Sequence, residues 1–410
     1  MLDSTGGTTR GETLIDPVVF NPYDYAFHED PYPTYARLRA EAPLYHNPEI
    51  GFWALSRHAD VQEAFKDNTR LSSANGVSLD PAAYGPHAHL VMSFLAMDDP
   101  RHMRLRQLVS RGFTPRRVGE LDGRILELTR QYLDPALAAG EFDWIAEVAG
   151  KLPMDVISEL MGVPGPDRAE LRRLADLVVH REDGVLDVPQ ASVAASISLM
   201  GYYKDMIEQR RRSRTEDLTS ALLDAEIDGD KLSDQEILAF MFLMVVAGNE
   251  TTTKLLGNAL YWGGRHPDQV AGVLGDPDRV PDWVEETLRF DTSSQIVART
   301  TAVDVEYHGR TVPAGEKMLL LIGSANRDGE VFEDADEFQI GRDSTNKIAS
   351  FGGGVHFCLG AHLARLEANV ALTEFARLVR GYEVDESGIE RVHSTNVRGF
   401  AALPVKVQVR

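Results

Sequence analysis

The chain carries its single cysteine inside the stretch FGGGVHFCLG, residues 351–360, which also holds four glycines. Glycine permits positive φ and a close backbone approach, so Gly352, Gly354 and Gly360 predict a tight loop that turns backbone N–H groups toward the sulfur of Cys358. A helical pattern follows from residue 361 to about residue 379. The positive end of that helix favours the thiolate, the form of cysteine that binds metal or attacks carbon. The stretch therefore predicts chemistry at Cys358.

Two other interpretations fit these residues alone: a buried structural cysteine beside a glycine-rich turn, and a cysteine nucleophile paired with a distant histidine. The order Phe-Gly-x-Gly-x-His-x-Cys-x-Gly, however, resembles the haem-ligand loop of the cytochromes P-450, the haem-thiolate monooxygenases. The resemblance implies that Cys358 is the axial ligand of iron in haem b, that Phe351 packs near the sulfur, and that His356 reaches a haem propionate. Gly352 and Gly360 belong to the same cofactor-binding loop. An anionic sulfur ligand suits this chemistry because it favours cleavage of the O–O bond.

A second motif interrupts the longest predicted helix. This helix starts at a capping box, SDQE at residues 233–236, and runs to about residue 264 with a middle that is apolar on every face, so it must lie in a large core. The polar run AGNETT, residues 247–252, interrupts the apolar part of this helix. A carboxylate and hydroxyl groups inside a buried helix are costly unless they are satisfied or used.

This polar run resembles the family segment Ala-Gly-x-Asp/Glu-Thr-Thr, which lies over the haem and binds O₂. The resemblance implies that Ala247 and Gly248 contact the haem, that the Thr251 hydroxyl orients a water molecule beside O₂, and that Glu250 gates the supply of protons. A purely structural kink, in which Thr251 bonds back to the carbonyl of Ala247, explains the same residues without chemistry.

Three further sequence features are weak evidence alone, but the two motifs above suggest a role for each of them. His102 and Arg106 are four residues apart and share a helix face, so they can hold one carboxylate, although a solvated basic helix explains them as well. By resemblance they anchor a haem propionate, as does Arg299. Glu286 and Arg289 match the family's Glu-x-x-Arg. By resemblance they form a buried structural pair, whereas alone they indicate only a surface salt bridge.

The substrate pocket is predicted from the same resemblance. The long segment 72–96 resembles the loop that roofs the pocket, and such loops are usually functional or disordered. The predicted pocket residues are Val91, Phe94, Met244, Ala247, Ile296, Val297 and Val397. They are apolar, which favours a terpenoid, steroid, fatty acid or polyketide as substrate.

Composition narrows the class of protein. The net charge of -21 over 410 residues argues against nucleic acid as a partner. The longest apolar run, residues 237–248, falls short of the ~20 residues that span a bilayer, and no signal peptide precedes it. One cysteine allows no internal disulfide and fits a reducing compartment. We therefore expect a cytoplasmic monomer without a membrane anchor, with a disordered lead-in at 1–15 and a single domain at 16–410.

The resemblance implies a fold that is mainly α: a large helical domain with a small β-rich region, and haem between the long central helix and the Cys358 loop. The expected activity is O₂- and NAD(P)H-dependent hydroxylation. No GxGxxG or flavin-binding segment is present, so electrons should come from a separate ferredoxin and its reductase. The stretch 101–117 holds six arginines and no acidic residue, and Arg104 and Arg111 are predicted to dock that acidic partner.

Two other activities remain open. A haem-thiolate peroxygenase would use hydrogen peroxide and would not need the pair Glu250 and Thr251. A haem sensor without turnover usually needs an output domain, for which this length leaves no room.

Overall fold

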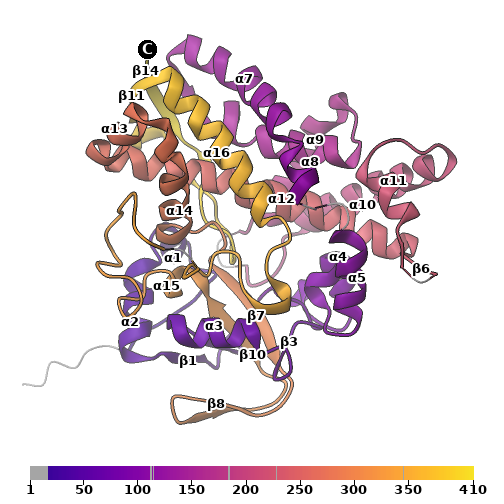
Figure 1. Ribbon diagram of the computed structural model, residues 1–410. Helices are drawn as coiled ribbons and strands as arrows, with labels where there is room; N and C mark the ends of the chain where they lie inside the picture. The colour runs from indigo at the N-terminus through magenta and orange to yellow at the C-terminus, as the bar shows by residue number, and fades with distance from the viewer. Residues whose placement is uncertain (1–16, 111–112, 114, 183–184, 228, 345) are drawn as a thin grey trace, which may run out of the picture.

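The computed structural model describes residues 17–110, 113, 115–182, 185–227, 229–344 and 346–410, so the predicted lead-in at 1–15 lies outside it. Helices predominate (Figure 1). They are α1 (Tyr25–Glu29), α2 (Tyr32–Glu41), α3 (His58–Lys66), α4 (His89–Met92), α5 (Arg101–Ser110), α6 (Pro115–Gly119), α7 (Asp122–Ala139), α8 (Leu152–Met161), α9 (Arg168–Val179), α10 (Gln190–Arg212), α11 (Leu218–Asp224), α12 (Asp234–Arg265), α13 (Pro267–Gly275), α14 (Val280–Phe290), α15 (Ile322–Ala325) and α16 (Ala361–Leu378). Within the described ranges, none of them is both long and apolar enough to cross a membrane.

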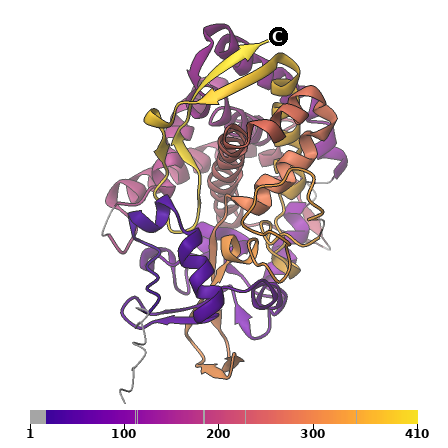
Figure 2. The same cartoon turned by 90° about the vertical axis from the view of Figure 1, so that its left-hand side faces the viewer.

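Helix α12 is the axis of the molecule. Its capping box forms as predicted: the Ser233 hydroxyl accepts from the Glu236 N–H at 3.3 Å, and the Glu236 carboxylate accepts from the Ser233 N–H at 2.9 Å. The helix has 32 residues, which corresponds to about 48 Å. Figure 2 shows it almost end on in the middle of the molecule, and it packs against α8, α9, α10, α14 and α16. An apolar helix is stable here because its neighbours cover most of its surface.

The two larger sheets lie at opposite ends of the molecule (Figure 1). They are β1 (Leu44–Asn47), β2 (Phe52–Leu55), β3 (Leu71–Ser72), β4 (Glu141–Asp143), β5 (Glu226–Ile227), β6 (Asp230–Lys231), β7 (Ile296–Thr301), β8 (Val305–Tyr307), β9 (Arg310–Val312), β10 (Lys317–Leu321), β11 (Val379–Val384), β12 (Glu390–Arg391), β13 (Phe400–Ala402) and β14 (Pro404–Val409). The largest sheet has the order β1-β2-β10-β7-β3, and β10 runs parallel to β2 and antiparallel to β7. A second sheet, β11-β14-β4, lies near the C-terminus.

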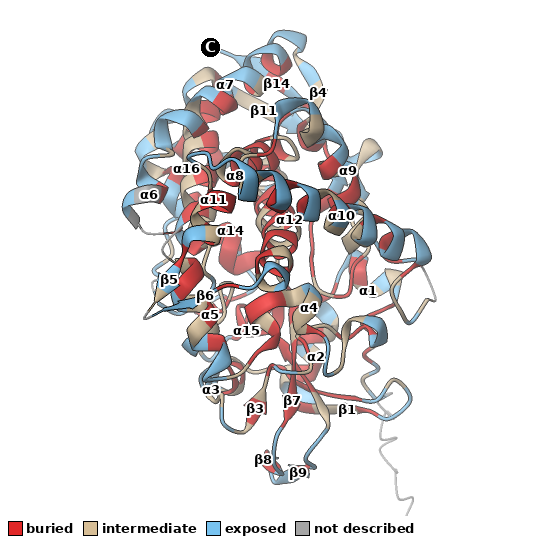
Figure 3. Cartoon of the chain, turned by 90° about the vertical axis from the view of Figure 1, so that its right-hand side faces the viewer, coloured by how far each residue is buried: buried red, intermediate tan, exposed pale blue. Residues whose placement is uncertain are grey.

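The core follows α12 and continues into α14 and α16 (Figure 3). On α14, Glu286 and Arg289 are 1% and 0% exposed and form two parallel hydrogen bonds of 2.7 and 2.8 Å. Arg289 also donates to the carbonyl groups of Asn326, Ala335 and Glu337. The pair therefore fixes the long irregular segment that leads from α15 to the cysteine loop.

Replacing Glu286 with glutamine should lower the free energy of unfolding by about 3–5 kcal/mol, because it leaves the Arg289 charge buried without its partner. Urea unfolding measures this change. The matched control is Glu285→Gln on the same helix, which removes a pair with Arg365 whose side chains are 34% and 30% exposed. We expect that control to change stability by no more than about 1 kcal/mol. Equal losses in both variants would contradict the role given to the buried pair.

Candidate active site

The cysteine loop connects the segment after α15 to α16, and two glycines allow its path. Gly352 and Gly354 have φ of +67° and +61°, in the left-handed region that favours glycine. A Cβ on Gly354 would lie 2.5 Å from the carbonyl oxygen of Phe65, so the close packing of the loop on α3 requires glycine there. Gly360 differs from the expectation: it is the N-cap of α16 with φ -87°, and a Cβ there would meet no protein atom within 4 Å beyond its chain neighbours. It leaves free space beside Cys358.

The Cys358 side chain opens into a cavity and accepts hydrogen bonds from the N–H groups of Gly360 and Ala361 at the start of α16. The N–H of Cys358 donates to the Phe351 carbonyl at 2.9 Å, which closes the loop. Burial nevertheless raises the pKa of Cys358 above its ordinary value, and these N–H groups together with Arg106 and Arg365 offset only part of that effect. The N–H groups at the helix end favour the thiolate as predicted, but in the protein alone the effect of burial on the pKa of Cys358 is larger.

On the other side of the cavity lies the polar part of α12. Ala247, Gly248 and Thr251 line the cavity, and the Thr251 hydroxyl donates to the Ala247 carbonyl at 2.9 Å. Glu250 does not line it. Adjacent residues of a helix face different directions, and the Glu250 carboxylate lies 3.2 Å from the ammonium group of Lys254, buried at the back of α12.

Four nitrogen-bearing side chains meet at one edge of the site: His102, Arg106, Arg299 and His356. The rings of His102 and His356 are 4.1 Å apart, and burial together with the charges of Arg299 and Arg106 lowers the pKa of His356 to about 3. Among the described residues no carboxylate pairs with either arginine, and His102 Nε2, Arg106 Nη1 and His356 Nδ1 are buried without a hydrogen-bond partner. Buried donors and positive charges without partners are costly, so this edge is suited to a ligand that carries carboxylates.

The cavity between α12 and the cysteine loop is partly open, and the space free of protein atoms there, open solvent included, is about 1420 Å³. Most of its lining is apolar. Predicted residues that line it are Phe94, Met244, Ala247, Gly248, Thr251, Val297, Arg106, Arg299, Phe351, Gly352, His356, Cys358 and Gly360. These features fit haem b: a sulfur donor on one side, a mainly apolar space lined in part by Gly248, Gly352 and Gly360, and a cationic edge for the two propionates.

Three predicted pocket residues lie elsewhere. Val91 on α4 is 39% exposed and is not part of the lining. Ile296 is adjacent to Val297 on β7, and neighbouring strand residues face opposite sides, so Ile296 packs against the aromatic cluster of Phe20. Val397 pairs with Ser294 through a β-bridge behind the wall. His102 lines an adjoining groove with Arg106 rather than the main cavity.

Sequence reasoning missed part of the lining. The turn Thr292–Ser293–Ser294 adds hydroxyl groups to an otherwise apolar wall, and Phe65 on α3 covers the loop glycines. Glu367 on α16 also lines the cavity, and burial raises its pKa well above the usual range. The position of Glu367, two turns into the predicted helix that follows Cys358, is the sequence feature that could have placed it in the cavity.

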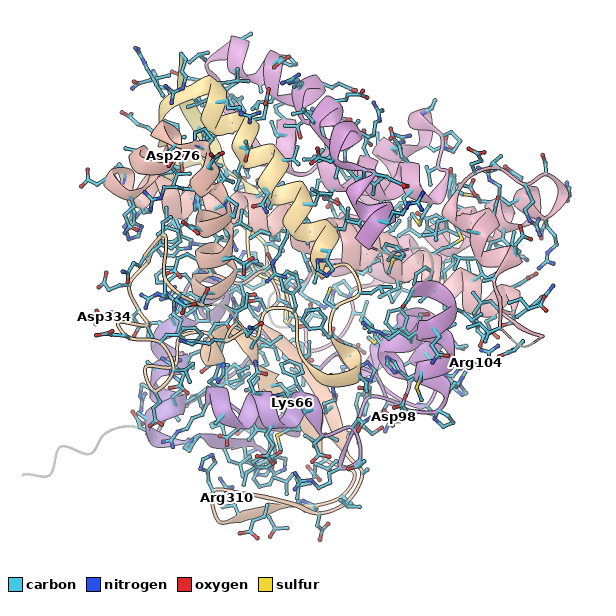
Figure 4. The ribbon with its side chains drawn as sticks, viewed as in Figure 1. Lys66, Asp98, Arg104, Asp276, Arg310 and Asp334 are labelled. Atoms are coloured by element: carbon cyan, nitrogen blue, oxygen red, sulfur yellow. The ribbon has the colours of Figure 1, made fainter. Side chains whose placement is uncertain are left out.

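Two arginines of the basic stretch 101–117, Arg104 and Arg116, pair with carboxylates of the chain. Arg104 on α5, at the rim of the molecule in Figure 4, pairs with Asp230 and with Glu236, the latter at 2.7 Å. Arg106 donates to the Phe357 carbonyl, Arg116 pairs with Glu120, and Arg111 lies outside the described residues. The docking role of Arg104 therefore stays a prediction, although its charge is already paired with Asp230 and Glu236 of the chain.

Comparisons with known proteins bear on this geometry. A sequence model of the family described as Cytochrome P450 matches residues 190–276 and 278–410. The chain is 63% identical over 396 residues to a Mycobacterium tuberculosis protein provisionally named cytochrome P450 123, covering 96% of this chain and 98% of that protein. It is 40% identical over 394 residues to vitamin D(3) 25-hydroxylase of Pseudonocardia autotrophica, covering 94% and 95%.

Solved structures agree. Cytochrome P450 CYP109Q5 from Chondromyces apiculatus superposes with a TM-score of 0.84 at 34% identity, covering 95% of this chain and 98% of that chain. CYP109E1 from Bacillus megaterium in complex with corticosterone gives 0.82 at 30% identity, covering 93% and 99%. The predicted mainly helical fold is confirmed, with the cavity between its central helix and its cysteine loop. The chain belongs to the cytochrome P450 family of haem b-dependent monooxygenases.

Proposed function

We propose that this protein hydroxylates an apolar organic molecule, using O₂ and electrons that pass from NAD(P)H through a ferredoxin reductase and a ferredoxin. The single observation that carries the proposal is the cavity in which Cys358 faces the Thr251 segment of α12 across an apolar space. A cysteine donor on one side and a hydroxyl group on the other are the two protein groups that activation of O₂ requires.

Named residues hold the cofactor in this proposal. The sulfur of Cys358 would hold the haem iron, and Arg106, Arg299, His102 and His356 would hold the propionates, whose oxygens would give partners to His102 Nε2, Arg106 Nη1 and His356 Nδ1. Thiolate-ligated haem supplies the activation of O₂ when it is bound. Ala247, Gly248 and Gly360 contribute little or no side chain, so they leave room for the ring.

Proton delivery is the task of α12. Thr251 lines the cavity and can hold a water molecule at its Oγ1, while that hydroxyl keeps its own proton on the Ala247 carbonyl. Glu250, buried behind it, supplies protons to that water. The apolar walls keep other water out, so protons reach the site by this route and not at random.

The substrate class follows from the lining. Apolar side chains line the cavity with Thr251, among them Phe94, Leu243, Met244, Val297 and Ile322, and the hydroxyl groups of the lining belong to Thr251, Thr252, Ser350 and the turn 292–294. Such a wall suits a steroid, terpenoid, fatty acid or polyketide with few polar groups. Two relatives support the steroid-like choice: one acts on vitamin D(3), and the structure of another holds corticosterone.

The proposal is tested by turnover with a surrogate ferredoxin, its reductase and NADPH, using testosterone, vitamin D(3) and hexadecanoic acid as probes. A blue shift of the haem absorption band identifies a probe that binds, because the ligand displaces water from iron. We expect an oxygenated product that depends on NADPH and on O₂. Product formed only from added hydrogen peroxide would favour the peroxygenase, and binding of probes without any product would favour the sensor.

A further inference from the structure

Lys254 is a lysine buried in the core of the protein. Its side chain is 5% exposed, and it lies one turn along α12 from Glu250, whose side chain is 2% exposed. The ammonium nitrogen of Lys254 is 3.2 Å from Oε2 of Glu250, so the two residues form a buried ion pair. Lysine is almost never fully buried unless it is paired. The proton route proposed for α12 uses Glu250 but assigns no part to its partner.

The chain segment after residue 398 fits closely around this lysine. A Cβ added at Gly399 would lie 2.6 Å from Cβ of Lys254 and 2.8 Å from its Cγ and Cδ, so a side chain at position 399 would force the lysine or the segment to move. The next residue, Phe400 at the start of β13, accepts a hydrogen bond of 3.4 Å from the ammonium group through its carbonyl oxygen. The backbone at 399–400 therefore packs on the stem of Lys254 and binds its charged end.

The ammonium group thus has two acceptors of different kinds, a carboxylate and a carbonyl group. An ionised carboxylate that is buried without a partner is costly, and an ammonium group at 3.2 Å offsets part of that cost. When Glu250 carries a proton, its attraction for the ammonium group weakens, but the Phe400 carbonyl still accepts from Lys254. Neither state of Glu250 therefore leaves a buried charge without a polar partner.

We propose that Lys254 is the positioning residue for Glu250. Its charge stabilises the carboxylate that forms each time Glu250 gives a proton to water near Thr251, and its bond to the Phe400 carbonyl holds it in place while Glu250 is protonated. Glu250 then recovers a proton from solvent, Lys254 keeps all of its protons, and no group is oxidised or reduced. This role in turnover rests on the proposed function of Glu250.

A double-mutant cycle in urea unfolding of the haem-loaded protein tests the ion pair without turnover. Lys254→Met leaves the Glu250 carboxylate buried without its partner, whereas Lys254→Met combined with Glu250→Gln removes both charges. We expect the urea midpoint of the double variant to fall by less than the sum of the two single losses. Asp176 on α9, whose charge acts on both members of the pair, is unchanged in every variant. Losses that simply add would overturn the ion pair.

The matched control is Lys204→Met, which replaces an exposed lysine on α10. It removes the same charge and introduces the same side chain, but at a site far along the sequence from Glu250. We expect it to keep the wild-type urea midpoint and to add nothing to the effect of Glu250→Gln. A coupling of Lys204 with Glu250 as large as that of Lys254 would show that the cycle reports net charge, and this result would overturn the pairing.

Turnover separates a positioning role from a purely structural one. Lys254→Met should slow NADPH oxidation by about tenfold or more, with product per NADPH and the red-shifted carbon monoxide band unchanged, because the supply of protons and not haem binding is impaired. In the Glu250→Gln background the same substitution should not slow oxidation further, since Lys254 acts only through Glu250. Lys204→Met should keep the rate of its parent in both backgrounds.

Gly399→Ala is a second variant that serves if Lys254→Met does not fold. Its methyl group displaces the lysine while both charges remain, so it should slow NADPH oxidation in the same way and have no further effect together with Glu250→Gln. Wild-type rates in these variants, or equal slowing in both backgrounds, would overturn the role of Lys254. Wild-type rates in Glu250→Gln would instead refute the function proposed for Glu250, and with it the role of Lys254 in turnover, while non-additive urea midpoints would leave the ion pair standing.

Discussion

Replacing Cys358 with serine is expected to abolish the strongly red-shifted absorption band of the reduced carbon monoxide adduct and to remove hydroxylation entirely. Cys358 is the only sulfur of a cysteine in the chain, and it faces the cavity from the start of α16. No described side chain stands beside it that could replace a thiolate, and a neutral oxygen donor does not push electron density onto iron in the same way. The expected loss of product is total within detection.

A second variant keeps this test meaningful if the serine protein loses haem. Cys358→His retains a ligand to iron, so the protein should bind haem but show the carbon monoxide spectrum of histidine ligation and no product. Val355→Ala, in an exposed position of the same loop, is the matched control and should keep the wild-type spectrum. A red-shifted band that survives in Cys358→Ser would refute the assignment of the ligand.

Local sequence patterns correctly predicted the helix α12 and the cysteine loop that form this site. The capping box at Ser233 started α12, and the glycines at 352 and 354 folded the loop, because each of these features depends on neighbours only a few residues away. The Glu286–Arg289 spacing indicated a pair on one helix face, and the structure adds that the pair is fully buried. That burial depends on the packing of α14 against the segment 326–342. The spacing of residues within α14 gives no information about this packing.

The errors have a common physical cause, because they concern contacts between distant segments. Ile296 and Val297 were both placed in the pocket, although a strand presents only one of two neighbours to each side. The stretch around Arg104 contains no acidic residue, but in the folded chain Arg104 pairs with Asp230 of β6 and Glu236 of α12.

Removal of the Thr251 hydroxyl should separate consumption of NADPH from formation of product. Hydroxylation with O₂ needs two protons delivered at the right atom, and a proton that arrives at the wrong one releases hydrogen peroxide. The Thr251 Oγ1 lies in the cavity wall with its own proton committed to the Ala247 carbonyl at 2.9 Å, so its lone pairs are free to hold a water that donates into the cavity. A positioned proton donor of this kind contributes about 10²–10⁴-fold.

Thr251→Ala should therefore bind haem and keep the thiolate spectrum, while product per NADPH falls by about tenfold or more and hydrogen peroxide rises to account for the difference. Two further variants separate the hydroxyl from the shape of the side chain. Thr251→Val keeps the volume and should be uncoupled like the alanine variant, whereas Thr251→Ser keeps the hydroxyl and should remain coupled. Glu250→Gln differs from all three, because impaired supply slows NADPH oxidation itself. Product, peroxide and NADPH are measured together in each reaction, and a Thr251→Val enzyme as tightly coupled as wild type would show that the hydroxyl serves only the helix.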